Sequence, residues 1–132
     1  MPQATTESVE NYLKAIFKLE NGGGVGTGEI ANRLHISSSS VSRMLKRLSK
    51  QEWVEHSPYR GVRLTEKGRR QALRVIRNHR ILETYLAEIL GVPWDRVDGE
   101  VEQLEHGVSD ELITRMEEAL GFPKRDPHGS PI

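Results

Sequence analysis

Apolar residues recur three or four positions apart in six segments of the chain, and this spacing predicts six helices with one buried face each. The segments are residues 8–20, 28–34, 38–51, 65–90, 95–107 and 109–120. Hydroxyl side chains stand at the start of four of them, where they can accept a hydrogen bond from a free backbone N–H. The predicted caps are Thr27, either Ser37 or Ser38, Thr65 and Ser109.

The chain between the third and fourth helices predicts a β-hairpin. Residues 53–57 and 62–65 are short β-like runs, and Pro58 and Gly61 between them are turn residues. Two short helices joined by a tight turn and followed by a hairpin form a winged helix-turn-helix pattern. The predicted fold class is therefore mainly α with a small β-hairpin wing, in which a winged helix-turn-helix precedes a helical dimerisation domain.

The formal net charge of zero conceals an uneven distribution. Residues 33–80 hold 13 basic and 3 acidic side chains, whereas residues 91–132 hold 4 basic and 10 acidic ones. A basic stretch that coincides with the helix-turn-helix and the hairpin favours binding to DNA. The opposite sign of the C-terminal part indicates a second role for that part.

The third predicted helix supplies the residue types of a DNA-reading helix. Small hydroxyls at its N-terminal end allow close approach to the major groove, and Arg43 can match a guanine edge with its planar guanidinium. The predicted DNA contacts are Ser37, Ser38, Ser39, Ser40, Ser42, Arg43, Lys46, Arg47, Arg60 and Arg63, and the last four are candidate phosphate contacts. A solvated basic face with a capping serine is the alternative, although one cap does not require four consecutive serines.

A single module of this kind binds DNA weakly, so we expect a homodimer that reads a palindromic operator in double-stranded DNA. The chain has no cysteine, which excludes disulfides and thiolate metal sites. No apolar run approaches the length of a membrane span and the N-terminus has no signal pattern, so we expect a cytoplasmic protein without membrane contact.

Histidine and acidic residues stand at helical spacing on two predicted helices. His79 and Glu83 lie four residues apart on one helix, and Glu102, Glu105 and His106 share a face of the next. Two helices that each offer an imidazole and a carboxylate can enclose a divalent ion. Oxygen and nitrogen ligands without a thiol favour Mn²⁺ or Fe²⁺. Ion pairs on a solvated face are the alternative interpretation, and the sequence leaves both open.

These motifs resemble the metal-dependent repressors related to the diphtheria toxin repressor, the iron-dependent regulators and the manganese transport regulators. The resembling segments are residues 10–13, 39–42, 59–65, 78–83, 100–110 and 126–132. The resemblance implies a DNA-binding domain over residues 1–73, a dimerisation and metal-binding domain over 74–124, and a linker-like tail over 125–132. It implies the metal ligands Asn11, His79, Glu83, Asp98, Glu102, Glu105 and His106. Many relatives have a third, SH3-like domain after such a tail, so the chain is either a two-domain member or stops at the linker.

Four positions distinguish the two branches of this family. Asn11 stands where relatives have Met or Asp, and Lys14 stands where manganese-type members can have a glutamate ligand. Asp98 replaces a histidine of the iron-type branch, and Glu102 replaces its cysteine and matches the manganese-type branch. An oxygen ligand at Glu102 favours the harder ion, so we expect Mn²⁺, with Fe²⁺ as the alternative.

Together these observations predict a metal-dependent DNA-binding regulator, a repressor of metal-uptake genes, and not an enzyme. We expect metal to tie the first helix, through Asn11, to the fourth and fifth helices, and so to favour the DNA-competent arrangement. The alternative is a winged-helix regulator that senses a non-metal signal, in which the His and Glu residues are structural. A helical metal-dependent hydrolase fits less well, because no nucleophile or general base accompanies the cluster.

Overall fold

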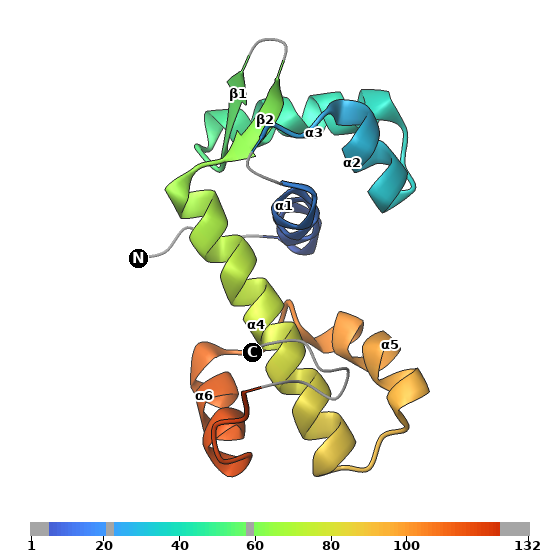
Figure 1. Cartoon of the computed structure of the whole chain (residues 1–132), viewed down its shortest axis with the longest axis vertical. Helices are drawn as coiled ribbons and strands as arrows, with labels where there is room; N and C mark the ends of the chain where they lie inside the picture. Colours follow the sequence, from blue (N-terminus) through green and yellow to red (C-terminus); the bar gives the residue numbers. More distant parts are fainter. Residues whose placement is uncertain (1–5, 21–22, 58–59, 125–132) are drawn as a thin grey trace. The chain divides into compact units, whose positions relative to one another are not determined.

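The computed structural model describes residues 6–20, 23–57 and 60–124 (Figure 1). The predicted turn residue Pro58 and the predicted C-terminal tail lie outside these residues. Within the described ranges the chain forms six helices and one two-stranded antiparallel hairpin, which confirms the predicted fold class. The chain divides into two compact units, Met1–Leu73 and Arg74–Ile132. No helix among the described residues combines the length and the apolar character that a membrane crossing requires.

The first unit contains three helices, the hairpin and the beginning of a fourth helix (Figure 1). Its elements are α1 (Glu7–Leu19), α2 (Thr27–Leu34), α3 (Ser38–Lys50), β1 (Val54–Ser57), β2 (Gly61–Leu64) and the first turns of α4 (Glu66–Glu88). Each helix contributes its apolar face to one core, as the periodicity predicts. The most deeply buried members of this core are Leu13, Ile16, Val25, Ile30, Val41, Leu48, Val62 and Ala72.

The hairpin is joined to the loop that precedes α2. Within the hairpin, Val54 pairs with Leu64 and Ser57 with Gly61. On the other side of β2, Val25 and Val62 exchange two backbone hydrogen bonds of 2.8 and 2.9 Å. Gly61 has a φ of +83°, and a Cβ there would lie 2.2 Å from the Val25 carbonyl oxygen. Only glycine fits this position, because both the backbone angle and the close approach exclude a side chain.

Three of the four predicted caps are confirmed. The side chains of Ser37, Thr65 and Ser109 accept hydrogen bonds from the backbone N–H groups three residues later. The prediction for Thr27 is wrong, because Thr27 is the first residue of α2 and Gly26 is its cap. The Glu29 carboxylate accepts the Gly26 N–H at 2.9 Å, so a side chain from inside the helix does part of the capping.

The second unit consists of the remainder of α4 with α5 (Trp94–Leu104) and α6 (Asp110–Ala119). The three helices share a core that is formed by Ile81, Leu82, Leu86, Val97, Val101 and Ile113. Two ion pairs also join α4 to α6, Arg74 with Asp110 at 2.7 Å and Arg77 with Glu117 at 2.5 Å. The fifth helix ends at Leu104, three residues earlier than predicted, and residues 105–107 form a turn.

Candidate metal centre and nucleic-acid interface

Three side chains of types that can bind a metal ion meet in the second unit, two from α4 and one from α5. His79 and Glu83 lie one turn apart on α4, and the His79 Nε2 is 3.4 Å from Glu83 Oε2. Asp98 on α5 places its Oδ1 3.6 Å from the same nitrogen. One donor atom from each residue lies within 4.8 Å of the other two. One imidazole nitrogen and two carboxylate oxygens form a donor set that fits a divalent ion such as Mn²⁺ or Fe²⁺.

The three side chains differ in their exposure to solvent. The Glu83 side chain is 3% exposed and that of His79 is 23% exposed, whereas that of Asp98 is 59% exposed. A buried carboxylate is costly unless a positive charge or hydrogen bonds stabilise it. The cluster therefore combines a buried carboxyl group with an exposed acidic residue at its edge, and a cation bound between them would supply the positive charge that a buried carboxylate requires.

Glu105 lies in the turn that follows α5, and its carboxylate contacts two histidines. Its Oε2 lies 2.5 Å from the Nδ1 of His79, and its Oε1 lies 3.3 Å from the Nε2 of His106. The residue is 2% exposed and keeps helical backbone angles, φ −61° and ψ −26°, although α5 has ended. The sequence suggested Glu105 as a ligand but did not indicate its bond to His79, because the two residues lie 26 positions apart.

The other predicted ligands occupy different environments. Glu102 is exposed on α5, and His106 is largely buried beside Glu105. Asn11 is half-buried on α1, in the first unit. Among the described residues, His79, Glu83 and Asp98 form the single group of three or more donors within 4.8 Å. Metal ligation by Asn11, Glu102, Glu105 and His106 therefore stays a prediction.

The helix α3 presents a polar, basic face opposite its buried one. Val41, Leu45 and Leu48 point into the core, whereas the hydroxyl and cationic side chains between them are exposed. The exposed residues are Ser37, Ser38, Ser39, Ser42, Arg43, Lys46 and Arg47 on and before α3, and Arg60 and Arg63 at the hairpin, while Ser40 is half-buried. All ten predicted DNA contacts thus lie at or near the surface of the first unit, and their role in binding stays a prediction.

Three of the serines have defined partners within the protein, and one such contact joins the Ser37 and Ser39 hydroxyls at 3.3 Å. The Ser37 hydroxyl accepts the Ser40 N–H at 3.2 Å as the cap of α3, and it donates to the Ser40 hydroxyl at 2.9 Å. Arg43 Nη2 donates to the same Ser40 oxygen at 3.4 Å. Ser37 and Ser40 thus organise the start of the helix and contact the Arg43 guanidinium, while Ser38 and Ser42 remain exposed.

A hollow of about 490 Å³ lies beside α3, with the hairpin residue His56 on its wall. Its lining residues are Thr27, Ser42, Leu45, Lys46, Ser49, Lys50 and His56. No acidic side chain is among them, so the hollow extends the basic surface of α3. Lys50 was missed as a candidate contact, although it follows Lys46 by one helical turn and so lies on the same face.

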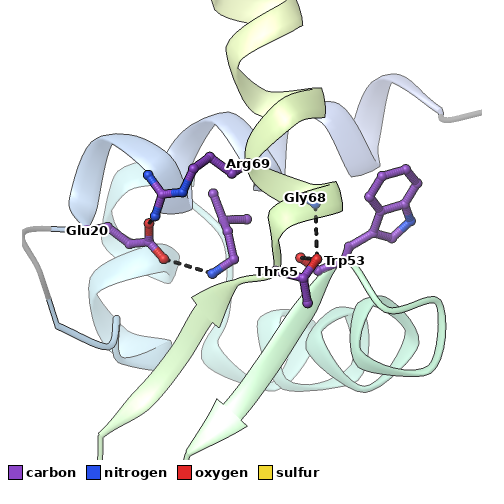
Figure 2. Close-up of polar contacts among 6 residues, drawn as sticks. Glu20, Trp53, Thr65, Gly68 and Arg69 are labelled. Atoms are coloured by element: carbon purple, nitrogen blue, oxygen red, sulfur yellow. Dashed lines mark hydrogen bonds and ion pairs between the residues drawn. The ribbon is translucent and has the colours of Figure 1, made fainter.

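Polar contacts fix the root of the hairpin, and the sequence indicated only one of them, the cap at Thr65 (Figure 2). The Glu20 carboxylate accepts the Leu64 N–H at 2.7 Å and pairs with Arg69 at 2.9 Å. The Thr65 hydroxyl donates to the Trp53 carbonyl at 3.1 Å and accepts the Gly68 N–H at 3.0 Å. These bonds join the end of α1 and the start of α4 to β2 and to Trp53, the residue before β1.

Comparison with known protein families gives two adjoining matches. The family described as "Iron dependent repressor, N-terminal DNA binding domain" matches residues 4–62. The family described as "Iron dependent repressor, metal binding and dimerisation domain" matches residues 65–132. The two matches cover nearly the whole chain.

Individual relatives agree with these matches. The chain is 35% identical over 127 residues to the iron-dependent repressor IdeR of Mycobacterium tuberculosis. This alignment covers 96% of the chain and 55% of that protein. The chain is also 34% identical over 123 residues to the transcriptional regulator MntR of Bacillus subtilis. This alignment covers 92% of the chain and 86% of that protein. The chain therefore spans just over half the length of IdeR and most of MntR.

Solved structures show the same fold. A structure described as a manganese-dependent transcriptional repressor in complex with manganese superposes with a TM-score of 0.82 at 44% sequence identity. The similarity covers 94% of the chain and 57% of that structure.

Proposed function

The chain belongs to the iron-dependent repressor family, whose members are transcriptional repressors rather than enzymes, and we propose that it is a DNA-binding regulator controlled by a divalent metal ion. The observation that carries this proposal is the cluster of His79, Glu83 and Asp98, with donor atoms within 4.8 Å of one another. The exposed hydroxyl and cationic side chains of α3 in the first unit support the DNA-binding part.

The proposed ligands are His79, Glu83 and Asp98, and the predicted additional ligands are Asn11, Glu102, Glu105 and His106. A bound divalent ion supplies positive charge that offsets the mutual repulsion of the carboxylates. His79 presents one nitrogen to Glu83 and Asp98, and the Glu83 carboxyl group is almost completely shielded from solvent. Glu83 lies on α4 and Asp98 lies on α5. A cation that offsets the repulsion between their carboxylates therefore stabilises the packing of the two helices.

We propose Mn²⁺ as the ion, with Fe²⁺ as the alternative. Two carboxylate oxygens and one imidazole nitrogen suit a fairly hard ion, and Asp98 adds an oxygen where a softer site would have a nitrogen. The relative MntR and the manganese-bound structure agree with this choice, whereas IdeR is named for iron. Titration calorimetry with Mn²⁺ and anaerobic Fe²⁺ compares the two affinities directly.

The proposed DNA ligand is a palindromic operator that a homodimer reads. The relation to a dimerisation domain supports the homodimer, and a two-fold dimer reads a two-fold site. Arg43 is the proposed base-reading residue, and Lys46, Arg47, Arg60 and Arg63 are the proposed phosphate contacts. Selection of binding sites from random duplexes, run in parallel with Mn²⁺ and with a chelator, tests this point. Inverted repeats enriched only with Mn²⁺ support the proposal, and no enrichment in either arm contradicts it.

A regulator that senses a non-metal signal is the second candidate function. The observation that favours it is that His79 already has carboxylate partners at both ring nitrogens, as a purely structural histidine would. Calorimetry separates the two candidates, because a structural cluster binds no Mn²⁺ specifically. Saturable binding that His79→Ala abolishes supports the metal-dependent regulator.

A further inference from the structure

We infer that Glu105 positions His79 for a cation held by His79, Glu83 and Asp98, and that it does so without being a ligand of that cation. The inference rests on the proposed function, since it requires the cluster to bind a cation. It assigns Glu105 a second role beside its predicted one as a ligand, and the two roles make different predictions.

The two ring nitrogens of His79 face different partners. Nδ1 lies 2.5 Å from Glu105 Oε2, while Nε2 lies 3.4 Å from Glu83 and 3.6 Å from Asp98. A neutral imidazole has one N–H and one lone pair, and an ionised carboxylate only accepts hydrogen bonds. Glu105 therefore favours the tautomer with the proton on Nδ1, which leaves the Nε2 lone pair directed at the side where the other two donors gather.

Glu105 is held rigidly enough to orient the ring. Its side chain is 1% exposed, and its backbone N–H donates to the Val101 carbonyl at 2.8 Å, which continues the bonding pattern of α5. A hydrogen bond to a buried carboxylate is stronger than one in water, because the surrounding dielectric is low. A carboxylate behind a ligating histidine also raises the basicity of the ring, and losing such a partner typically weakens metal binding by about 10–100-fold.

The two oxygens of Glu105 serve two different histidines. Oε2 faces His79 and Oε1 faces His106, at 2.5 and 3.3 Å. The carboxylate therefore connects the cluster of His79, Glu83 and Asp98 with the region of the predicted additional ligands. If Glu105 acted only as a ligand beside His106, its removal would leave the affinity of the three-residue cluster unchanged. If it positions His79, its removal weakens that cluster whether or not His106 is present.

The test measures Mn²⁺ affinity in a His106→Ala background, which removes the neighbouring predicted ligand. Glu105→Gln is compared with Glu100→Gln, which removes the same charge from an exposed position on α5. Free Mn²⁺ is followed by its electron paramagnetic resonance signal during titration. We expect Glu105→Gln to weaken binding by about 10–100-fold in both the wild-type and the His106→Ala background. Glu100→Gln leaves the affinity unchanged.

A second measurement reads the tautomer of His79 without any metal. Nitrogen-15 shifts of the imidazole show a proton on Nδ1 in the wild type, and a mixture of tautomers in Glu105→Gln, because the amide can donate as well as accept. If the glutamine variant does not fold, Glu105→Asp takes its place, since the shorter side chain keeps the charge but not the reach.

The outcomes distinguish this inference from the proposed function. Failure of the wild type to bind Mn²⁺ overturns both. Unchanged Mn²⁺ affinity in Glu105→Gln, or a loss confined to the background that retains His106, overturns the inference alone.

Discussion

Glu20 and Arg69 form an ion pair of 2.9 Å although 49 positions separate them in the sequence. The second oxygen of the same carboxylate accepts the Leu64 N–H at 2.7 Å, and the Glu20 side chain is only 8% exposed. One buried carboxylate thus joins the end of α1 to the hairpin and to the start of α4 (Figure 2).

Glu20→Ala is expected to destabilise the first unit by about 2 kcal/mol, because two donors lose their partner and the Leu64 N–H becomes unsatisfied. Urea unfolding monitored by fluorescence measures the change. Trp53 is 3% exposed and lies in this unit, so a Trp94→Phe background makes the emission specific to it. The matched control is Glu66→Ala, whose ion pair with Arg70 is exposed, and it is expected to cost at most about 1 kcal/mol. Equal losses would show that Glu20 has no special role.

Gly68→Ala is expected to destabilise the same unit through a steric clash. A Cβ at Gly68 would lie 2.1 Å from the Trp53 carbonyl oxygen, so the hairpin or α4 must move, at a cost of about 2 kcal/mol or more. Gly28→Ala is the matched control, because it lies on α2 with no atom within 4 Å of the added methyl. It is expected to stabilise the unit by up to about 1 kcal/mol, since alanine favours a helix over glycine. A stable Gly68→Ala variant would contradict the close approach.

Glu83→Gln is expected to remove the stabilisation that Mn²⁺ gives to the protein. A ligand that binds only the folded state at 100 times its Kd stabilises it by about 2.7 kcal/mol. Differential scanning calorimetry with and without Mn²⁺ measures the shift in melting temperature. Glu88→Gln, an exposed position at the end of α4, is the control and keeps the full shift. A Glu83→Gln variant that still responds to Mn²⁺ would exclude this carboxylate as a ligand.

Arg43→Ala and Lys46→Ala are expected to impair DNA binding in different ways. Loss of a base contact at Arg43 costs about 1–3 kcal/mol and relaxes the preference for one base pair. Loss of a phosphate contact at Lys46 weakens binding to all sequences and lowers the slope of log K against log salt by about 1. Anisotropy titrations on the selected operator and on a mutated one, at several salt concentrations, measure both effects. Identical behaviour of the two variants would contradict the assignment of roles.

Local signals in the sequence predicted most of the fold. Periodicity identified all six helices, and hydroxyl caps identified three helix starts, because both signals act over three or four neighbouring residues. The cap at Thr27 was predicted wrongly because Glu29, inside the helix, accepts the Gly26 N–H. The end of α5 was placed three residues too late, since residues 105–107 form a turn after a helix that carries no stop signal before Gly107.

Helical spacing indicated specific contacts only between residues close in the chain, whereas Asp98 entered the predicted site through the family resemblance. The spacing of His79 and Glu83 indicated their meeting from the sequence, because one helical turn brings them together. The contact of His79 with Glu105 depends on how α4 packs against the end of α5, and no local pattern carries that information. The role of Glu20 was missed for the same reason, since its partners Leu64 and Arg69 are 44 and 49 positions away.

In the proposed mechanism, a divalent ion at the cluster of His79, Glu83 and Asp98 controls DNA binding. The most direct measurement is the affinity of the protein for its selected operator in Mn²⁺ and after removal of Mn²⁺ with a chelator, for the wild type and for His79→Ala. We expect the wild type to bind tightly in Mn²⁺, to lose binding with the chelator and to recover it when Mn²⁺ is restored. We expect His79→Ala to bind weakly in every condition. Equal affinity of the wild type with Mn²⁺ and with the chelator would contradict this mechanism.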